Sequence, residues 1–191
     1  MLATTPRFTT FAEYLTYSDD SGQLYELFNG ELVAMPPESG LNVEIATFLL
    51  VKFAALVGYR RVRGQGLELE VRGEPKNRYP DLTIITEEHV QQLTQRNTIR
   101  LSMAPPPLVV EVVSPGEIQR ERDYIAKRLQ YQDRGIPEYW LVDPQVGAVI
   151  VLELHQGVYG KIGSFREDHL IVSSHFPGLD LRANQIFTQG A

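Results

Sequence analysis

A run of six residues, Leu108-Val-Val-Glu-Val-Val113, contains one charged side chain among five aliphatic ones. Such a run is typical of a strand that is buried on both faces, as in the middle of a sheet covered by helices. An unpaired carboxylate in that setting costs several kcal/mol, so Glu111 needs a metal ion, a basic partner or a proton. The run therefore predicts a central strand and makes Glu111 a candidate functional residue.

Helix and strand patterns surround this run. Apolar residues at helical spacing predict helices, and alternating apolar and polar residues predict strands. The expected elements, in chain order, are a short helix over 9–18 with Thr9 or Thr10 as N-cap, a hairpin over 24–35 around Asn29-Gly30, a helix over 39–57 that Gly58 ends, strands over 60–71 and 81–85, a polar helix or loop over 87–104, the strand over 108–113, a helix over 117–134 that Gly135 ends, strands over 138–143 and 148–154, and shorter β segments beyond. This order predicts an α/β (α+β) fold, in which helices flank one mixed β-sheet.

Length and composition limit the class of protein. A chain of 191 residues is long enough for one substantial domain. Its 43% hydrophobic and 22% charged residues exclude a disordered chain, a coiled coil and a collagen-like fibre. Because no internal repeat or long linker divides the sequence, we expect a single domain over 1–191. Its parts would be an N-terminal helix and hairpin (1–35), a core (36–143) and C-terminal β segments (144–191).

Several kinds of site are excluded or not expected. The absence of cysteine excludes disulfides, thiolate zinc sites and cysteine nucleophiles. The sequence contains neither a phosphate-binding Gly-x-x-x-x-Gly-Lys-Ser/Thr loop nor a Gly-x-Ser-x-Gly nucleophile elbow. No secretory signal is recognisable at the N-terminus, and no apolar run reaches the roughly 18 residues of a membrane span. We therefore expect a soluble, cytoplasmic protein without a membrane partner.

The charge balance gives little information about nucleic-acid binding. Lys plus Arg number 18 and Asp plus Glu number 24, which gives a net charge of −6. Proteins that bind nucleic acid usually have a basic surplus, because neutralisation of phosphates supplies much of the affinity. Between residues 58 and 78, however, basic residues outnumber acidic ones. A cluster of catalytic carboxylates would also lower the net charge, so the overall sign decides nothing.

A second acid, Asp81, occupies a position similar to that of Glu111. It follows Tyr79-Pro80 and begins the apolar strand Leu82-Thr-Ile-Ile85. Two acids at the ends of adjacent apolar strands can converge on one divalent cation. Oxygen ligands of this kind suit Mg²⁺ or Mn²⁺. The alternative for Glu111 is a structural acid that caps a turn or pairs with an arginine.

The helix after Glu111 supplies a third group. Asp123, Lys127 and Tyr131 are spaced i, i+4 and i+8, which places them on one helix face. A lysine there can neutralise the acids and hold an attacking water. Alternatively, Asp123 and Lys127 form an ordinary surface pair worth a few tenths of a kcal/mol.

Together these residues resemble a known signature. Pro80-Asp81 followed by Glu111 resembles the split Pro-Asp…(Asp/Glu)-x-Lys motif, PD-(D/E)XK, of restriction-endonuclease-like folds, although Val113 stands where that lysine usually lies. The wider set of matching residues is Tyr25-Glu26-Leu27, Asn29-Gly30-Glu31-Leu32, Pro80-Asp81, Leu108 to Pro115, Asp123, Lys127, Tyr131 and Gly135 to Asp143. This set resembles the Uma-two family of bacterial restriction endonucleases over nearly the whole chain.

The resemblance implies a restriction-endonuclease-like core and metal-dependent hydrolysis of phosphodiester bonds, with DNA as the expected substrate. Asp81, Glu111 and the backbone carbonyl of Val112 would bind Mg²⁺ or Mn²⁺. Lys127, the counterpart of the missing lysine, would position or deprotonate water.

Two auxiliary acids and one substitution complete the candidate site. Asp123 and Glu44 are the auxiliary candidates, and Glu44 is equally well explained as a solvated helix residue. Asn42 stands where such sequences often have a histidine near the start of the long helix. Since cleavage of both DNA strands commonly uses a symmetric dimer, a homodimer is a further expectation, with the apolar C-terminal strands as a candidate interface.

Two other functions compete with the nuclease. One is a binding or regulatory protein that has kept the fold and lost turnover, as the displaced lysine and acidic composition suggest. The other is a sugar hydrolase with a pair of carboxylates, which leaves Lys127 without a role. The sequence ranks the nuclease first and the sugar hydrolase last.

Overall fold

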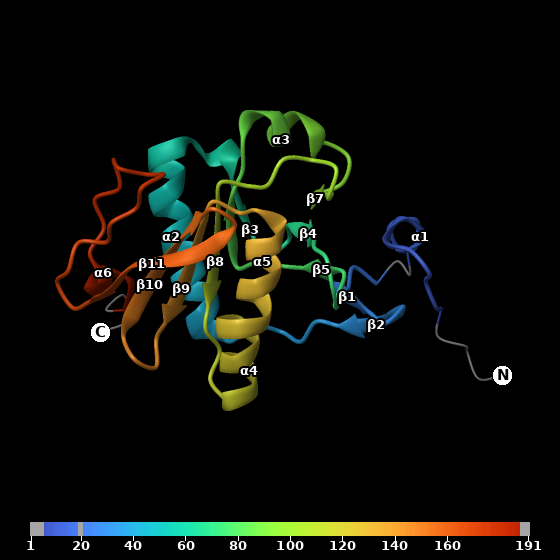
Figure 1. Cartoon of the computed structure of the whole chain (residues 1–191), viewed down its shortest axis with the longest axis horizontal. Coiled ribbons are helices and arrows are strands. Elements are labelled where there is room, and N and C mark those ends of the chain that lie inside the picture. Colours follow the sequence, from blue (N-terminus) through green and yellow to red (C-terminus); the bar gives the residue numbers. More distant parts are fainter. Residues whose placement is uncertain (1–5, 19–20, 188–191) are drawn as a thin grey trace.

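A six-stranded sheet forms the centre of the computed structural model, which describes residues 6–18 and 21–187 (Figure 1). Its strand order is β11–β10–β9–β8–β6–β3. The strands are β3 (Val62–Gly64), β6 (Leu82–Ile84), β8 (Leu108–Val112), β9 (Glu138–Asp143), β10 (Ala148–His155) and β11 (Val158–Arg166). β8 and β9 are parallel, and the other neighbours are antiparallel. The mixed sheet confirms the predicted fold class.

Helices cover both faces of this sheet. In Figure 1, α2 (Gly40–Val57) lies behind it, while α4 (Glu117–Glu121) and α5 (Arg128–Arg134) lie in front. The side chains of β8 alternate between two buried clusters: Val110 packs with Phe53 of α2, and Val109 packs with Tyr131 of α5. All five residues of β8 are buried, because each face of the strand has its own helix layer.

Local sequence signals position several of these elements. Thr10 caps α1 (Phe11–Leu15) by accepting from the backbone N–H of Glu13, whose side chain completes a capping box. The predicted hairpin is β1 (Tyr25–Phe28) and β2 (Glu31–Ala34), joined by Asn29 and Gly30 with φ of 49° and 79°. Two positive φ angles are what a tight hairpin turn requires, and Asn-Gly adopts them at little cost.

The single strand predicted over 60–71 is wrong. A short 3₁₀ turn, η1 (Tyr59–Arg61), precedes β3, and β4 (Glu68–Glu70) belongs to a separate sheet with β5 (Asn77–Arg78) and β7 (Thr98–Ile99). The chain turns between them, where the N–H of Leu67 donates to the carbonyl of Gly64. Two glycines flanking Gln65 make this turn easy, so the alternating pattern continues across two different strands.

Glu68 lies in this second sheet at 3% exposure, although alternation predicts it as the solvent-facing side of a strand. It accepts hydrogen bonds from Asn77, Tyr79, Thr98 and Arg96. The same Asn77 side chain bonds the backbone of Leu27 and Tyr25 in β1. Glu68 is therefore a structural acid that connects the small sheet to the N-terminal hairpin.

The remaining segments complete both ends of the molecule. The polar stretch over 87–104 contains α3 (Glu87–Gln92) and β7, and the C-terminal part contains α6 (Ala183–Phe187), a helix that was not expected among β segments. The six-stranded sheet continues through β10 and β11, beyond the end of the expected core at residue 143. The division into three parts remains a prediction.

By length and composition alone, α2 is long and apolar enough to cross a membrane, and 22% of its residues are buried. Its inner face nevertheless belongs to the core, since Leu49 and Phe53 are fully buried against the central sheet. Withdrawal of α2 would expose this cluster to water, so we describe it as a core helix.

Candidate active site

Sheet register brings Asp81 and Glu111 together at the same end of two neighbouring central strands. β6 and β8 are antiparallel, with Leu82 opposite Val110, so the position before β6 meets the end of β8. The backbone N–H of Val112 donates to Oδ2 of Asp81 over 2.7 Å. Both carboxylates are shielded from solvent, at 8% exposure for Asp81 and 1% for Glu111. The two acids expected to converge thus lie close to one another.

Glu111 is the centre of a buried polar cluster. Nζ of Lys127 lies 2.7 Å from Oε2 of Glu111 and 2.9 Å from Oδ1 of Asp123. The hydroxyl of Tyr131 donates to Oε1 of Glu111 over 2.5 Å. The three helix residues predicted to share a face therefore converge on this strand acid, and the surface-pair alternative for Asp123 and Lys127 does not hold.

The helix is wider where it carries these groups. Between α4 and α5 lies one π-helical segment, η2 (Arg122–Lys127), so the predicted single helix over 117–134 is continuous with an irregular middle. Within this segment Lys127 lies one turn beyond Asp123, and the two side chains form an ion pair at 2.9 Å. Such segments are frequent at functional sites.

Burial and mutual repulsion dominate the electrostatics. Burial, and then the charge of Glu111, raise the pKa of Asp81 to about 8. Burial also raises the pKa of Glu111, against the lowering effect of Lys127 and of the Tyr131 hydroxyl. For Lys127, burial opposes the charged form, but Glu111 and Asp123 outweigh it and raise the pKa of the ammonium. The lysine is thus held as a cation among buried acids.

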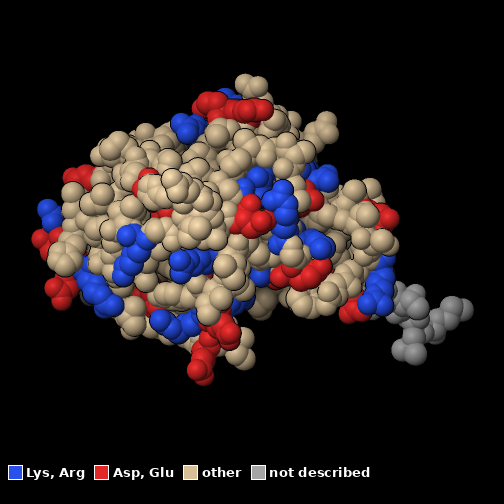
Figure 2. All heavy atoms as spheres, in the orientation of Figure 1, with Lys and Arg blue, Asp and Glu red and all other residues tan. Residues whose placement is uncertain are grey.

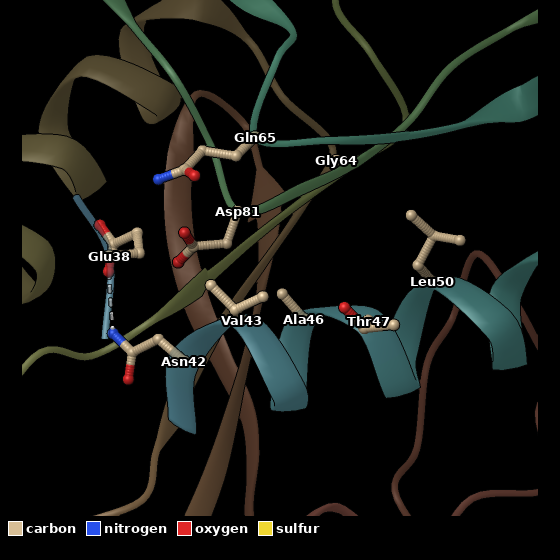
Figure 3. A pocket seen from close by; sticks show the side chains of 9 residues that line it. All are labelled: Glu38, Asn42, Val43, Ala46, Thr47, Leu50, Gly64, Gln65 and Asp81. Atoms are coloured by element: carbon tan, nitrogen blue, oxygen red, sulfur yellow. Dashed lines mark hydrogen bonds between the residues drawn. The ribbon is translucent and has the colours of Figure 1, made fainter. Parts of the chain in front are cut away.

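A cavity of about 110 Å³ adjoins Asp81 (Figure 3). It lies between α2 and the turn after β3, and Figure 3 shows the carboxylate of Asp81 directed toward α2, with the side chains of Glu38 and Gln65 nearby. The residues lining it are Glu38, Asn42, Val43, Ala46, Thr47, Leu50, Gly64, Gln65 and Asp81. Asp81 is therefore the member of the acidic pair that contacts this space.

Asn42 connects the cavity to the sheet. Its Nδ2 contacts Oε2 of Glu38 at 3.2 Å, Oγ of Ser114 at 3.0 Å and the carbonyl of Val112 at 3.4 Å. The Val112 carbonyl, expected as a metal ligand, thus faces an amide donor here. Asn42 is 2% exposed and orders the segment before α2 against the end of β8.

Sequence reasoning missed Glu38 and Gln65. Glu38 lies in the irregular segment before α2, and Gln65 lies in the turn that interrupts the strand predicted over 60–71. Neither position is marked by residue spacing, and only the fold brings them to Asp81. Glu44, the other auxiliary candidate, is exposed on α2 and does not line the cavity.

Arg122 is a further cation beside the acids. Its Nε lies 3.2 Å from Oδ1 of Asp123, and its side chain is 35% exposed. A second hollow of about 230 Å³ has Arg122, Gln119, Ser39 and Ser114 among its lining residues. Since Glu38 lines both spaces, they adjoin along the segment that precedes α2.

The donor set fits a divalent cation. Asp81, Glu111 and Asp123 are buried carboxylates, and Lys127 and Arg122 are the cations beside them. In the described residues, Oδ2 of Asp123 is a buried oxygen with no hydrogen-bond partner. Those residues contain no cluster of three or more His, Asp or Glu in metal-binding geometry. A cation would therefore be held by Asp81 and Glu111 together with backbone or water oxygens.

Several basic residues over 58–78 are paired or hydrogen-bonded within the fold. Arg78 is buried and pairs with Glu26 at 3.0 Å, and Lys76 pairs with Glu74 at 2.8 Å. Arg61 and Arg63 donate to backbone carbonyls. Figure 2 shows Lys and Arg interspersed with Asp and Glu over the face in view. The local charge count therefore overstates the positive potential of this segment.

The molecule is an α/β protein in which a buried acid–lysine cluster lies between the central sheet and the helix that packs on it. A model of the Uma2 family, described as "Putative restriction endonuclease", matches residues 11–184, and the chain belongs to this family. Membership places the protein among nucleases at the level of class.

A solved structure supports the same fold. A crystal structure titled as a putative nuclease belonging to DUF820, from Anabaena variabilis, superposes with a TM-score of 0.70 at 19% sequence identity. The alignment covers 93% of this chain and 96% of that one. No curated protein matches the chain.

Proposed function

We propose that the protein is a metal-dependent endonuclease that hydrolyses phosphodiester bonds in DNA. The observation that carries this proposal is the buried Glu111, which contacts Lys127 and lies beside Asp81, the acid that lines the cavity. A structural salt bridge would need one acid and one base. The additional buried acids Asp81 and Asp123 are instead characteristic of a site that binds a cation.

Each residue has a role in this proposal. Asp81, Glu111 and the carbonyl of Val112 would hold Mg²⁺ or Mn²⁺, which would polarise the phosphate and stabilise the leaving oxygen. Lys127, held as a cation, would orient the attacking water and balance its developing negative charge, and Asp123 would keep the lysine in place. The guanidinium of Arg122 is suited to a neighbouring phosphate, because its planar donors match phosphate oxygens.

The PD-(D/E)XK assignment belongs to this proposal as well. Val113, at the usual lysine position, is fully buried in the cluster between the sheet and α5. Lys127 contacts the same acid from the helix that packs on that face. This arrangement supports a lysine that has moved from the strand to the helix while keeping its contact with the acid.

The second candidate is a nuclease-fold protein that binds nucleic acid without cutting it. It is favoured by the engagement of both carboxylate oxygens of Glu111, one with Lys127 and one with Tyr131. A cation that uses Glu111 must share this carboxylate with those donors. The two candidates differ in whether divalent cations bind and whether DNA is cleaved.

The test is a cleavage assay on supercoiled plasmid and on single-stranded DNA and RNA with Mg²⁺ or Mn²⁺. The variants are Asp81→Asn, Glu111→Gln and Lys127→Met, and Arg72→Gln, in an exposed ion pair with Asp133, is the control. We expect metal-dependent DNA cleavage by the wild type and by the control, with a loss of at least about 100-fold in each site variant.

Other outcomes select other conclusions. Cleavage that survives in all three site variants contradicts the assignment of these residues. A wild type that cleaves RNA alone contradicts DNA as the substrate. No cleavage, with DNA binding that is insensitive to Asp81→Asn, favours the non-catalytic candidate.

A further inference from the structure

The outward face of α2 is unusually apolar for an exposed helix. Its large exposed side chains, and that of the tyrosine just beyond it, are Leu41 (53% exposed), Val43 (50%), Val51 (60%), Leu56 (38%) and Tyr59 (79%). Thr47 and Ala55, also exposed, lie four residues from Val51 on either side and continue the same stripe. Val43, Thr47, Val51 and Ala55 thus form one exposed row along the helix, and Leu41 and Leu56 lie to its side. An exposed apolar row of this kind on a helix commonly marks a contact with another molecule.

The charges of α2 are few and of opposite sign. In its eighteen residues the only charged side chains are Glu44 and Lys52. They lie eight positions apart, on either side of Phe48, and within the described residues neither is part of an ion pair. Nζ of Lys52 lies over the Phe48 ring, 5.4 Å from its centroid.

This placement is self-complementary. If two copies of α2 pack antiparallel about a two-fold axis near Phe48, Glu44 of each copy falls beside Lys52 of the other. The symmetry produces this contact twice. Small side chains at Gly40, Thr47 and Ala55 allow the two helices to approach closely.

We propose that the outward face of α2 is the interface through which two copies of this chain form a symmetric dimer. The apolar stripe supplies the buried contact, and the two Glu44–Lys52 pairs fix the antiparallel orientation. This interface is an alternative to the apolar C-terminal strands as the surface for self-association.

Other occupants fit this face less well. A helix that lies on a membrane surface has a Lys- and Arg-rich polar face, whereas α2 contains one lysine and the chain has a net charge of −6. Nucleic acid requires cations, which the stripe does not offer. A second copy supplies both the apolar surface and the matching charges.

The interface borders the candidate active site. Val43 and Thr47 belong to the exposed stripe and also line the cavity beside Asp81. Antiparallel pairing through α2 would therefore place two such cavities on either side of the two-fold axis. Dimerisation itself does not depend on catalysis and can be tested separately.

The experiment is sedimentation equilibrium of the full chain with a charge-swap series. We expect a dimer for the wild type, a dissociation constant raised by about tenfold or more in Glu44→Lys and in Lys52→Glu, and recovery in the double variant E44K/K52E. Each single swap places like charges opposite one another twice, while the double swap restores both pairs.

Two matched substitutions test the surface. One is Val51→Glu on the α2 stripe, and the other is Val158→Glu on β11. Both valines are 60% exposed, so neither substitution should disturb folding. Circular dichroism would verify this. We expect Val51→Glu alone to give monomers. The proposal would be overturned by a monomeric wild type or by dissociation in Val158→Glu instead of Val51→Glu. It would also be overturned if the double variant E44K/K52E did not recover dimerisation. A monomer whose stripe binds anionic phospholipid vesicles and loses them in Val51→Glu would overturn it as well.

Discussion

Nζ of Lys127 lies 2.7 Å from Oε2 of Glu111, and the two side chains are 9% and 1% exposed. They come from different layers, since Glu111 belongs to β8 of the central sheet and Lys127 to η2 on the helix above it. Each charge is tolerated in the core because the other is present. The pair therefore couples the packing of helix and sheet to the protonation state of the candidate site.

Loss of Lys127 is expected to cost both activity and stability. Lys127→Met leaves Glu111 and Asp123 buried without their shared cation, which should lower the free energy of unfolding by about 3–5 kcal/mol at neutral pH. Urea unfolding would measure this. Arg72→Gln, which breaks an ion pair with side chains 61% and 54% exposed, should cost less than about 1 kcal/mol. Equal losses in the two variants would contradict the buried-pair interpretation.

Tyr131→Phe should separate positioning from packing. The ring and its edge contact with Tyr139 at 5.2 Å remain, but the hydrogen bond to Glu111 is lost at a cost of about 1.5–3 kcal/mol. Burial raises the pKa of Glu111 and this hydroxyl lowers it, so the variant's pKa should rise further.

If Glu111 acts ionised, the acidic limb of the pH–rate profile should move to higher pH in Tyr131→Phe. Tyr159→Phe, which loses a hydroxyl bonded to the Ile136 carbonyl, provides the comparison and should leave that limb in place. An unchanged limb in both variants would remove Tyr131 from the site.

The contribution of Asp81 to stability, measured without divalent cations, should fall as pH rises from about 4 to about 8. Burial and Glu111 raise the pKa of Asp81 from 3.8 to about 8, so in this window the folded state holds a proton that the unfolded chain has released. The contribution of this group is about 1.4 kcal/mol per pH unit. Asp81→Asn carries no such proton, and chemical denaturation in EDTA should show a flatter pH dependence. A slope identical to that of the wild type would contradict the raised pKa.

Cation binding should release a proton. At pH 7 the raised pKa keeps Asp81 largely protonated in the absence of metal, whereas a divalent cation requires the carboxylate. Calorimetric titration of Mn²⁺ in buffers of different ionisation enthalpy should therefore report release of about one proton. Asp81→Asn should bind weakly or not at all and release none. Tight binding without proton release would indicate a site elsewhere.

Local patterns predicted most elements because they depend on neighbouring residues. β9 has the bounds expected from the sequence, and the long helix ends at Gly135 in a left-handed conformation with φ of 78°. The hairpin follows from Asn29-Gly30 in the same way. Periodicity failed over 60–71, since alternation does not reveal that the chain changes sheets at the turn around Gln65.

Buried polar residues were the least predictable part of the chain. Glu68 and Arg78 resemble solvent-facing residues in the sequence, yet each is 3% exposed and has distant hydrogen-bond partners. Their partners come from segments as far as 52 residues away, so no local window contains the information. The burial of Arg78 is also one reason why the charge count over 58–78 overstates the positive surface of this segment.

The sequence by itself determined the central strand, the isolated acid within it and the helical face carrying Asp123, Lys127 and Tyr131, because spacing alone fixes which side chains share a face. Only the tertiary structure decided that β6 runs antiparallel to β8, which brings Asp81 to Glu111, and that η2 packs so that Lys127 reaches the same acid. It also placed Glu38 and Gln65 at the cavity. These contacts depend on strand order and helix packing, which are properties of the whole folded chain.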